Sequence, residues 1–97
     1  MRTVIADTSK GKRVWIQGTC DKYSWPVGAR YSVTYELDTI VIQLDHDNGK
    51  RKVSKGKGGI IDLCGKRVTQ WAQGKTSVSV VYARDKGALY VVRDDNS

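Results

Sequence analysis

The sequence predicts a mainly β protein: a small barrel-like body built from two β-α-β-β units related by pseudo-twofold symmetry. Three observations lead to this prediction. Several short runs alternate β-branched or aromatic residues with polar ones, which is typical of half-buried strands. An ordered set of such runs occurs twice along the chain, as expected of an internal repeat. Each set also contains a Trp-x-x-Gly segment, starting at Trp25 and at Trp71.

Length and composition limit the possibilities. The chain has 97 residues, with 17 lysines and arginines against 10 aspartates and glutamates, a formal net charge of +7. We expect a single compact domain over residues 1–97, and a large two-lobed enzyme is excluded. No apolar run approaches the roughly 20 residues that span a bilayer, so we expect no membrane partner. Without a visible signal peptide or a disulfide framework, we expect a cytoplasmic location.

The first repeat covers approximately residues 12–45. Proline cannot continue a helix and glycine suits a tight turn, so Pro26 and Gly28 mark the end of its short helix. The expected elements are a strand at 14–18, helical turns at 21–25, a strand at 31–35, a hairpin turn at 36–38 and a strand at 39–44.

The second repeat covers approximately residues 57–94 and has the same order of elements. A connector over 46–56 separates the two repeats, and Asn48-Gly49 predicts a turn inside it. The expected elements are a strand at 60–65, a helix at 66–73, a strand at 77–82, a turn at 84–87 and a strand at 88–92.

Basic residues gather ahead of each repeat's first strand. Residues 49–57 read GKRKVSKGK, with five cations and no acid. Such a run is a solvated loop as often as a polyanion contact. Arg13 and Arg51 are interpreted as corresponding positions, and pseudo-twofold symmetry would bring their loops onto one face. The expected nucleic-acid-binding residues, mostly in phosphate contacts, are Lys10, Lys12, Arg13, Lys50, Arg51, Lys52, Lys55 and Lys57.

The order of strand, glycine, short helix, aromatic-x-x-Gly turn and hairpin resembles the AbrB/MazE/SymE superfamily of swapped-hairpin proteins. The first repeat, with VWIQG at 14–18 and Trp25-Pro26-Val27-Gly28, is most similar to the SymE-like form. The second repeat is similar to the AbrB-like form, with a basic lead-in before its first strand. In that superfamily two chains interleave their hairpins, so two copies in one chain imply a monomeric pseudo-dimer or a homodimer.

The resemblance implies two functions. AbrB- and MazE-like members bind DNA, which would make the chain a transcriptional or antitoxin-like regulator that docks a basic loop face on duplex DNA, at the nucleoid. SymE-like members are toxins that act on RNA. The charge alone leaves a third class open, a protein-interaction module or inhibitor that binds an acidic partner.

Residues that often carry catalysis or metal binding are few. His46 is expected to be an exposed turn residue, and Cys20 and Cys64, interpreted as near the same point of the two repeats, to be small buried side chains. Two cysteines and one histidine do not make a convincing zinc site. The glycines at 56–59 lack the P-loop spacing. We therefore expect no catalytic residue, no metal and no cofactor, and a ribonuclease would need a cluster that the sequence does not indicate.

The three tryptophans could stack on bases or fill the core. Trp25 and Trp71 occupy matching places in the repeats, which favours core packing. Trp15 faces inward or outward depending on strand register, and the sequence leaves both open.

Overall fold

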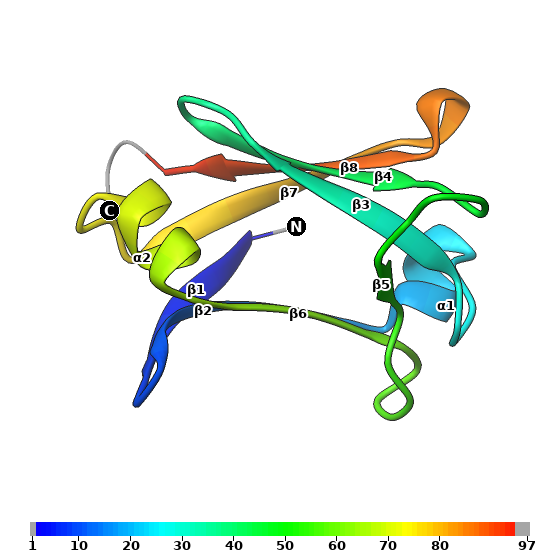
Figure 1. The fold of residues 1–97 in the computed structure, drawn as a ribbon, viewed down its shortest axis with the longest axis horizontal. Coiled ribbons are helices and arrows are strands. Elements are labelled where there is room, and N and C mark those ends of the chain that lie inside the picture. The colour runs from blue at the N-terminus through cyan, green and yellow to red at the C-terminus, as the bar shows by residue number, and fades with distance from the viewer. Residues whose placement is uncertain (1, 95–97) are drawn as a thin grey trace.

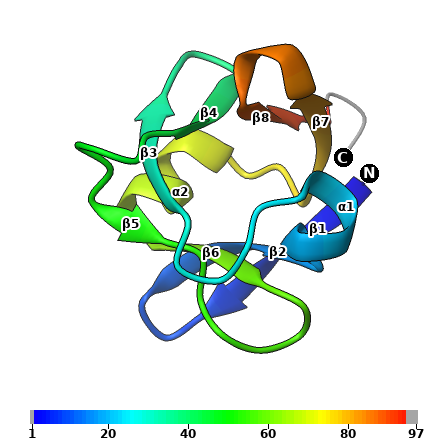
Figure 2. The ribbon, with the colours of Figure 1, turned by 90° about the vertical axis from the view of Figure 1, so that its right-hand side faces the viewer.

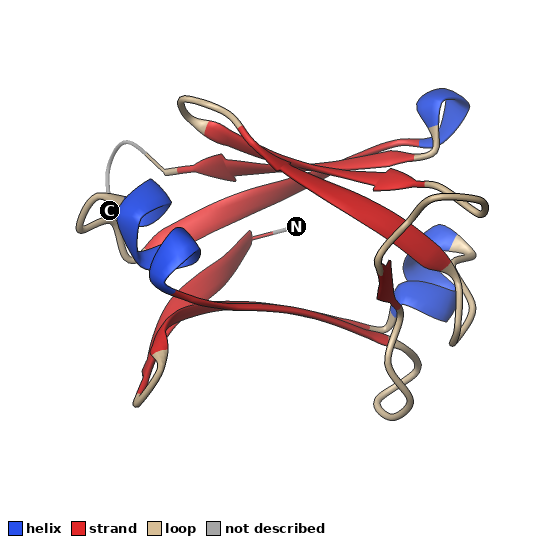
Figure 3. Ribbon diagram, viewed as in Figure 1, coloured by secondary structure: helices blue, strands red, loops and turns tan. Residues whose placement is uncertain are grey.

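The structure, a computed structural model that describes residues 2–94, is mainly β (Figure 1 and Figure 3). The sequence prediction of fold class is confirmed. The elements in chain order are β1 (Arg2–Thr8), β2 (Gly11–Gln17), α1 (Thr19–Tyr23), β3 (Arg30–Tyr35), β4 (Thr39–Leu44), β5 (Arg51–Lys52), β6 (Ile60–Gly65), α2 (Lys66–Ala72), β7 (Ser77–Ala83), the 3-10 turn η1 (Arg84–Lys86) and β8 (Ala88–Arg93).

The strands form one sheet in the order β5-β3-β4-β8-β7-β1-β2-β6, and all paired strands are antiparallel. Its two edges approach each other, because Ser54 just after β5 pairs with Ile60 at the start of β6. The sheet therefore curls into a nearly closed barrel, seen from one end in Figure 2. Closure is incomplete, because β5 pairs with β3 only through Arg51 and Lys52, and the pairing of Ser54 with Ile60 is an isolated bridge.

The barrel interior is filled by alternate residues of each strand. Val14 and Ile16 of β2 are fully buried, and so are Ile61 and Leu63 of β6. On the opposite wall the buried positions are Ile40, Ile42, Leu89 and Val91. Burying each such side chain stabilises the fold by about 1.5–3 kcal/mol.

Strand register reveals the twofold relation between the two halves. Gly18 and Gly65 immediately precede α1 and α2. Three residues before each glycine stand Trp15 and Asp62, and these two residues are paired across β2 and β6. Because an antiparallel pair is related to itself by a twofold axis, the pseudo-twofold axis passes between them. The predicted repeat of elements thus corresponds to a symmetric arrangement in space.

Each helix lies beside the hairpin of the other half (Figure 1). Tyr82 of β7 donates a hydrogen bond from its hydroxyl to the carbonyl of Tyr23 in α1, at 3.0 Å. At the other end, the Arg67 guanidinium of α2 lies 4.8 Å from the ring centroid of Tyr35 in β3. The two halves are interleaved.

Two strands were not predicted. β1 lies ahead of the first predicted repeat, where no element was predicted, and β5 lies within the predicted connector, so each unit is β-β-α-β-β. Each extra strand pairs with the other half: Thr3 of β1 is opposite Val78, and Arg51 of β5 is opposite Tyr31. Pairing between segments distant in sequence leaves a weak local signal, which explains the omission. The first helix also begins two residues before the expected turns at 21–25.

Candidate nucleic-acid interface

The basic connector segment, residues 50–57, lies on the barrel surface. Its five cations are all exposed: Lys50, Arg51, Lys52, Lys55 and Lys57. Its backbone is nevertheless tied to the barrel, because the buried Val53 donates its N–H to the carbonyl of Ala29 at 2.9 Å. Strand pairing of β5 with β3 holds the preceding residues. The backbone that carries these cations is therefore held in place on the barrel, while their side chains reach into solvent.

The turn after this segment packs against the start of α1. The N–H of Gly18 donates to the Lys57 carbonyl at 3.1 Å, and the N–H of Cys20 donates to the Gly58 carbonyl at 2.9 Å. Gly59 has φ +96°, and a Cβ there would come within 2.2 Å of Thr19 Oγ1. Only glycine fits this close approach without rearrangement. The turn is built to bring the segment onto the barrel.

The eight predicted contact residues differ in how their charges are compensated. Lys12 forms an ion pair with Asp7 at 2.5 Å, and Arg13 Nε lies 3.0 Å from Asp62 Oδ1 without the alignment of a hydrogen bond. Within residues 2–94, Lys10 and the five cations of the basic connector segment form no ion pair with a carboxylate. Five of the six predicted contact residues that form no such ion pair thus lie on the connector.

The two basic groups do not share one loop cluster. β2 begins opposite the end of β6, with Lys12 paired to Gly65 and Gln17 to Ile60. The ladder has six residue pairs, each about 3.4 Å long. The turn before β2, which holds Lys10, and the turn before β6, which holds Lys57, therefore lie roughly 20 Å apart. Figure 1 draws these two turns at opposite ends of the barrel. The interpretation of Arg13 and Arg51 as corresponding positions is wrong, because Arg13 lies inside β2 while Arg51 matches Thr3 of β1 in register.

The outward face of β2 carries Trp15, whose orientation the sequence left open. Its neighbours Val14 and Ile16 are buried, so strand alternation places Trp15 outside. The Arg13 guanidinium lies 5.3 Å from the Trp15 ring centroid, and Trp15 Nε1 donates to Gln17 Oε1 at 3.1 Å. Trp25 and Trp71 are buried, which confirms their prediction as core residues.

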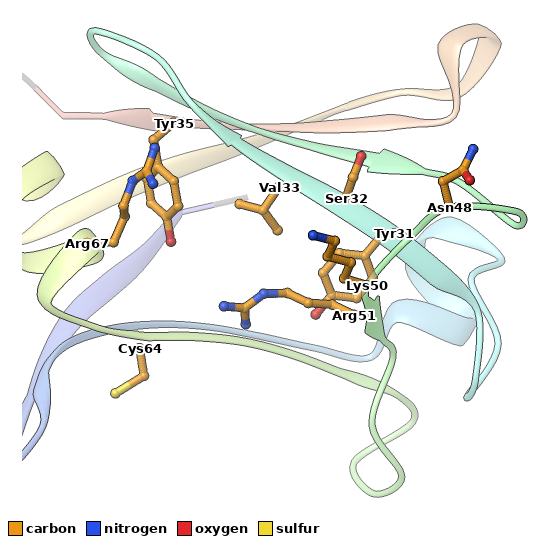
Figure 4. A pocket seen from close by; sticks show the side chains of 9 residues that line it. All are labelled: Tyr31, Ser32, Val33, Tyr35, Asn48, Lys50, Arg51, Cys64 and Arg67. Atoms are coloured by element: carbon orange, nitrogen blue, oxygen red, sulfur yellow. The ribbon is translucent and has the colours of Figure 1, made fainter.

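A cavity of about 380 Å³ opens between β3 and the start of α2, beside the basic connector segment (Figure 4). Nine residues line it and none is acidic. The lining residues that carry charge, hydroxyl or ring groups are Tyr31, Ser32, Tyr35, Lys50, Arg51 and Arg67. In Figure 4, Arg51 extends from β5 along the opening, and Arg67 lies against Tyr35.

Both cavity tyrosines remain protonated at neutral pH. Burial raises the pKa of Tyr35, while the positive charges of Arg51 and Arg67 act in the opposite direction. Burial also raises the pKa of Tyr31, against the charge of Arg51 and a hydrogen bond with it, and the negative charge of Asp62 adds to the increase. Since the guanidinium groups of Arg51 and Arg67 both act on the Tyr35 phenol, these two cations and the hydroxyl belong to one electrostatic site.

The remaining candidate residues do not form a site. His46 is exposed, as predicted. Cys20 and Cys64 are half-buried free thiols, and they do not occupy matching points: Cys20 lies in α1 and Cys64 in β6. Among residues 2–94, no group of three or more histidine, cysteine or acidic side chains is arranged to hold a metal ion.

Sequence reasoning missed Tyr31, Tyr35 and Arg67 as site residues. The two tyrosines were visible as alternating positions of one strand, and Arg67 as part of a helix in the other repeat. Only the interleaving of the two halves brings Arg67 to Tyr35.

Comparison with known proteins finds no matching family model, no matching curated protein and no matching solved structure. The resemblance to the swapped-hairpin superfamily therefore stays a prediction. In the part of the chain that is described, no helix has the length and apolar character needed to cross a bilayer.

Proposed function

We propose that this protein binds nucleic acid by docking the basic connector segment on the phosphates of duplex DNA. One observation carries the proposal: five exposed cations, without ion-pair partners in residues 2–94, project from a segment tied to the barrel. Such a surface attracts a polyanion without competition from its own carboxylates.

The tryptophans favour duplex over single-stranded nucleic acid. Proteins that bind single strands stack bases on exposed aromatic rings. Trp25 and Trp71 are buried, and one face of Trp15 is covered by Arg13. Phosphate contacts therefore supply most of the binding free energy. A transcriptional or antitoxin-like role in the cytoplasm, at the nucleoid, is the biological setting that we propose for it.

Docking through one segment changes the expected contact set. Lys12 and Arg13 are already paired with Asp7 and Asp62, so bringing them to phosphate would require breaking those pairs. Lys10 is exposed but belongs to the distant lead-in loop. We therefore assign the contacts to the basic connector segment, and expect Lys12 and Arg13 to contribute little.

The test measures fluorescence anisotropy of a labelled random-sequence duplex over a salt series. Five phosphate contacts give a slope of log K against log salt of about −4.5. In the double variant Lys55→Ala/Lys57→Ala we expect the slope to fall by about 2 units and the affinity to drop about tenfold or more. The matched control is Arg84→Ala/Lys86→Ala, which removes the same charge from exposed positions in η1.

Equal losses in the two double variants would overturn the assignment to this segment, because net charge alone would then explain the binding. Cleavage of bulk RNA by the pure protein would favour a toxin acting on RNA instead. Capture of one acidic protein, with no duplex binding at low salt, would favour the protein-interaction class.

A further inference from the structure

We propose that the cavity between β3 and α2 binds a small organic phosphate, of about the size of a nucleoside monophosphate. The cavity shares Lys50 and Arg51 with the duplex-docking segment, whereas its other lining residues, Arg67 among them, lie outside that segment. The cavity volume of about 380 Å³ falls in the range of small-molecule sites.

The charge of the lining selects an anion. Lys50, Arg51 and Arg67 all line the cavity, and no acidic residue does. These three cations come from two segments far apart in sequence, the connector and α2, which converge on one opening (Figure 4). A dianionic phosphate compensates this charge better than a single carboxylate. Its oxygens also accept from several donors at once.

The tyrosines add donors and an apolar wall. Phenols are protonated at neutral pH and burial raises the pKa of both tyrosines further, so their hydroxyls can donate to an anionic oxygen. The Tyr35 hydroxyl has no hydrogen-bond partner among the described residues, although the side chain packs against Arg67. Val33 and the tyrosine rings form the apolar part of the lining. A ligand with a phosphate and an organic body matches both parts.

Contacts with the buried Tyr31 of β3 orient the Arg51 side chain. It hydrogen-bonds with Tyr31, which is 2% exposed, and its backbone pairs with the same residue in β3. A cation oriented by a buried neighbour loses less side-chain entropy when a ligand arrives. Arg51 and Arg67 are therefore the expected phosphate ligands.

Isothermal titration calorimetry with adenosine monophosphate tests the proposal, with adenosine and succinate as matched ligands that lack phosphate. We expect the monophosphate to bind with a Kd below 1 mM, and adenosine and succinate to bind at least tenfold more weakly. Inorganic phosphate should compete with the monophosphate. Absence of monophosphate binding, or equal binding of adenosine or succinate, would overturn the proposal.

Two variants locate the site. Arg67→Gln should weaken monophosphate binding at least tenfold, and Tyr35→Phe about threefold or more. The control Lys66→Gln removes a cation from the neighbouring exposed position of α2, outside the cavity lining, and should leave binding unchanged. An equal loss in Lys66→Gln would refute the location. Circular dichroism and thermal melting establish that each variant is folded.

Two further ligands separate a free phosphate from the end of a nucleic acid chain. A short single-stranded oligonucleotide is titrated with and without a 5′-phosphate. Binding of both the monophosphate and the phosphorylated oligonucleotide identifies a chain end as an accepted source, while binding of the monophosphate alone identifies a free small molecule. Arg67→Gln should leave the affinity for an unphosphorylated duplex unchanged, so that failure here and failure of duplex docking remain distinguishable.

Discussion

The two ends of the barrel have the same arrangement of helix and hairpin but differ in the side chains that surround the matched tyrosine. At the α1 end, Tyr82 packs against Tyr23 and Trp25, with ring centroids 5.1 Å and 6.4 Å away. At the α2 end, the corresponding tyrosine of β3, Tyr35, packs against Arg67 and borders the cavity. Aromatic rings fill the first end, whereas cations surround an opening at the second.

A second difference concerns the carboxylate that follows each hairpin. Asp94 and Asp45 occupy matching positions, since their N–H groups donate to the carbonyls of Ser77 and Arg30. The Asp94 carboxylate pairs with Arg2 of β1 at 2.8 Å. The Asp45 carboxylate instead accepts from the Asn48 N–H at 3.0 Å, within a turn. Arg2 of β1 is thereby paired with a carboxylate, whereas Arg51 and Lys52 of β5 form no ion pair with a carboxylate among the described residues.

The largest expected effect of a single substitution is on the filled end. Trp25→Ala removes a side chain that is 1% exposed and in edge contact with two tyrosines. We expect a loss of about 3–5 kcal/mol in the free energy of unfolding, measured by urea denaturation. Trp71→Ala should cost less, because among residues 2–94 no aromatic ring contacts Trp71, which packs instead against the Arg93 guanidinium, 5.4 Å from its ring centroid. An equal or larger loss for Trp71→Ala would contradict the comparison.

The matched tyrosines give an intermediate effect. Tyr82→Phe deletes the hydroxyl that donates to the Tyr23 carbonyl at 3.0 Å, and should cost about 1 kcal/mol of folding stability. Tyr35→Phe removes a hydroxyl without a hydrogen-bond partner in the described part of the chain, so the stability change should be near zero. Thermal and urea denaturation measure both variants. Monophosphate binding should show the reverse order, with Tyr35→Phe the impaired variant. A Tyr35→Phe protein less stable than Tyr82→Phe would contradict the view that only the Tyr82 hydroxyl stabilises the fold.

Much of this layout was predictable from the sequence, because alternation and turn residues are local signals. The strands around Val14, Tyr31 and Val80 were expected from period-2 patterns, and the strand around Ile61 from a short apolar run that ends in glycine. β1 and β5 were not expected, because each is stabilised by pairing with the other half of the chain.

The candidate site was predictable only in part, for the same reason. The run of cations at 50–57 is contiguous in sequence and was visible. The ion pair of Arg13 depends on the β2–β6 register that brings Asp62 close, and the cavity depends on interleaved halves. Charge composition reports neither, so it did not separate the ion-paired Lys12 and Arg13 from the unpaired cations and did not indicate Arg67.

The smallest expected effect concerns the Asp94 carboxylate, which pairs with Arg2 of β1. Hydrogen bonds from Ser77 and Ser79, at 2.7 Å and 3.0 Å, together with the charge of Arg2, hold the pKa of Asp94 below its ordinary value of 3.8. A carboxyl whose pKa is lower in the folded state stabilises the fold above its unfolded pKa, and this contribution is lost as the pH falls through the folded pKa. NMR titration of the Asp94 carboxyl should therefore give a midpoint below 3.8, which Ser77→Ala raises and Ser79→Ala raises less. A midpoint that Ser77→Ala leaves in place would show that this hydrogen bond does not hold the Asp94 carboxylate, and that the contrast with the unpaired cations of β5 has another cause.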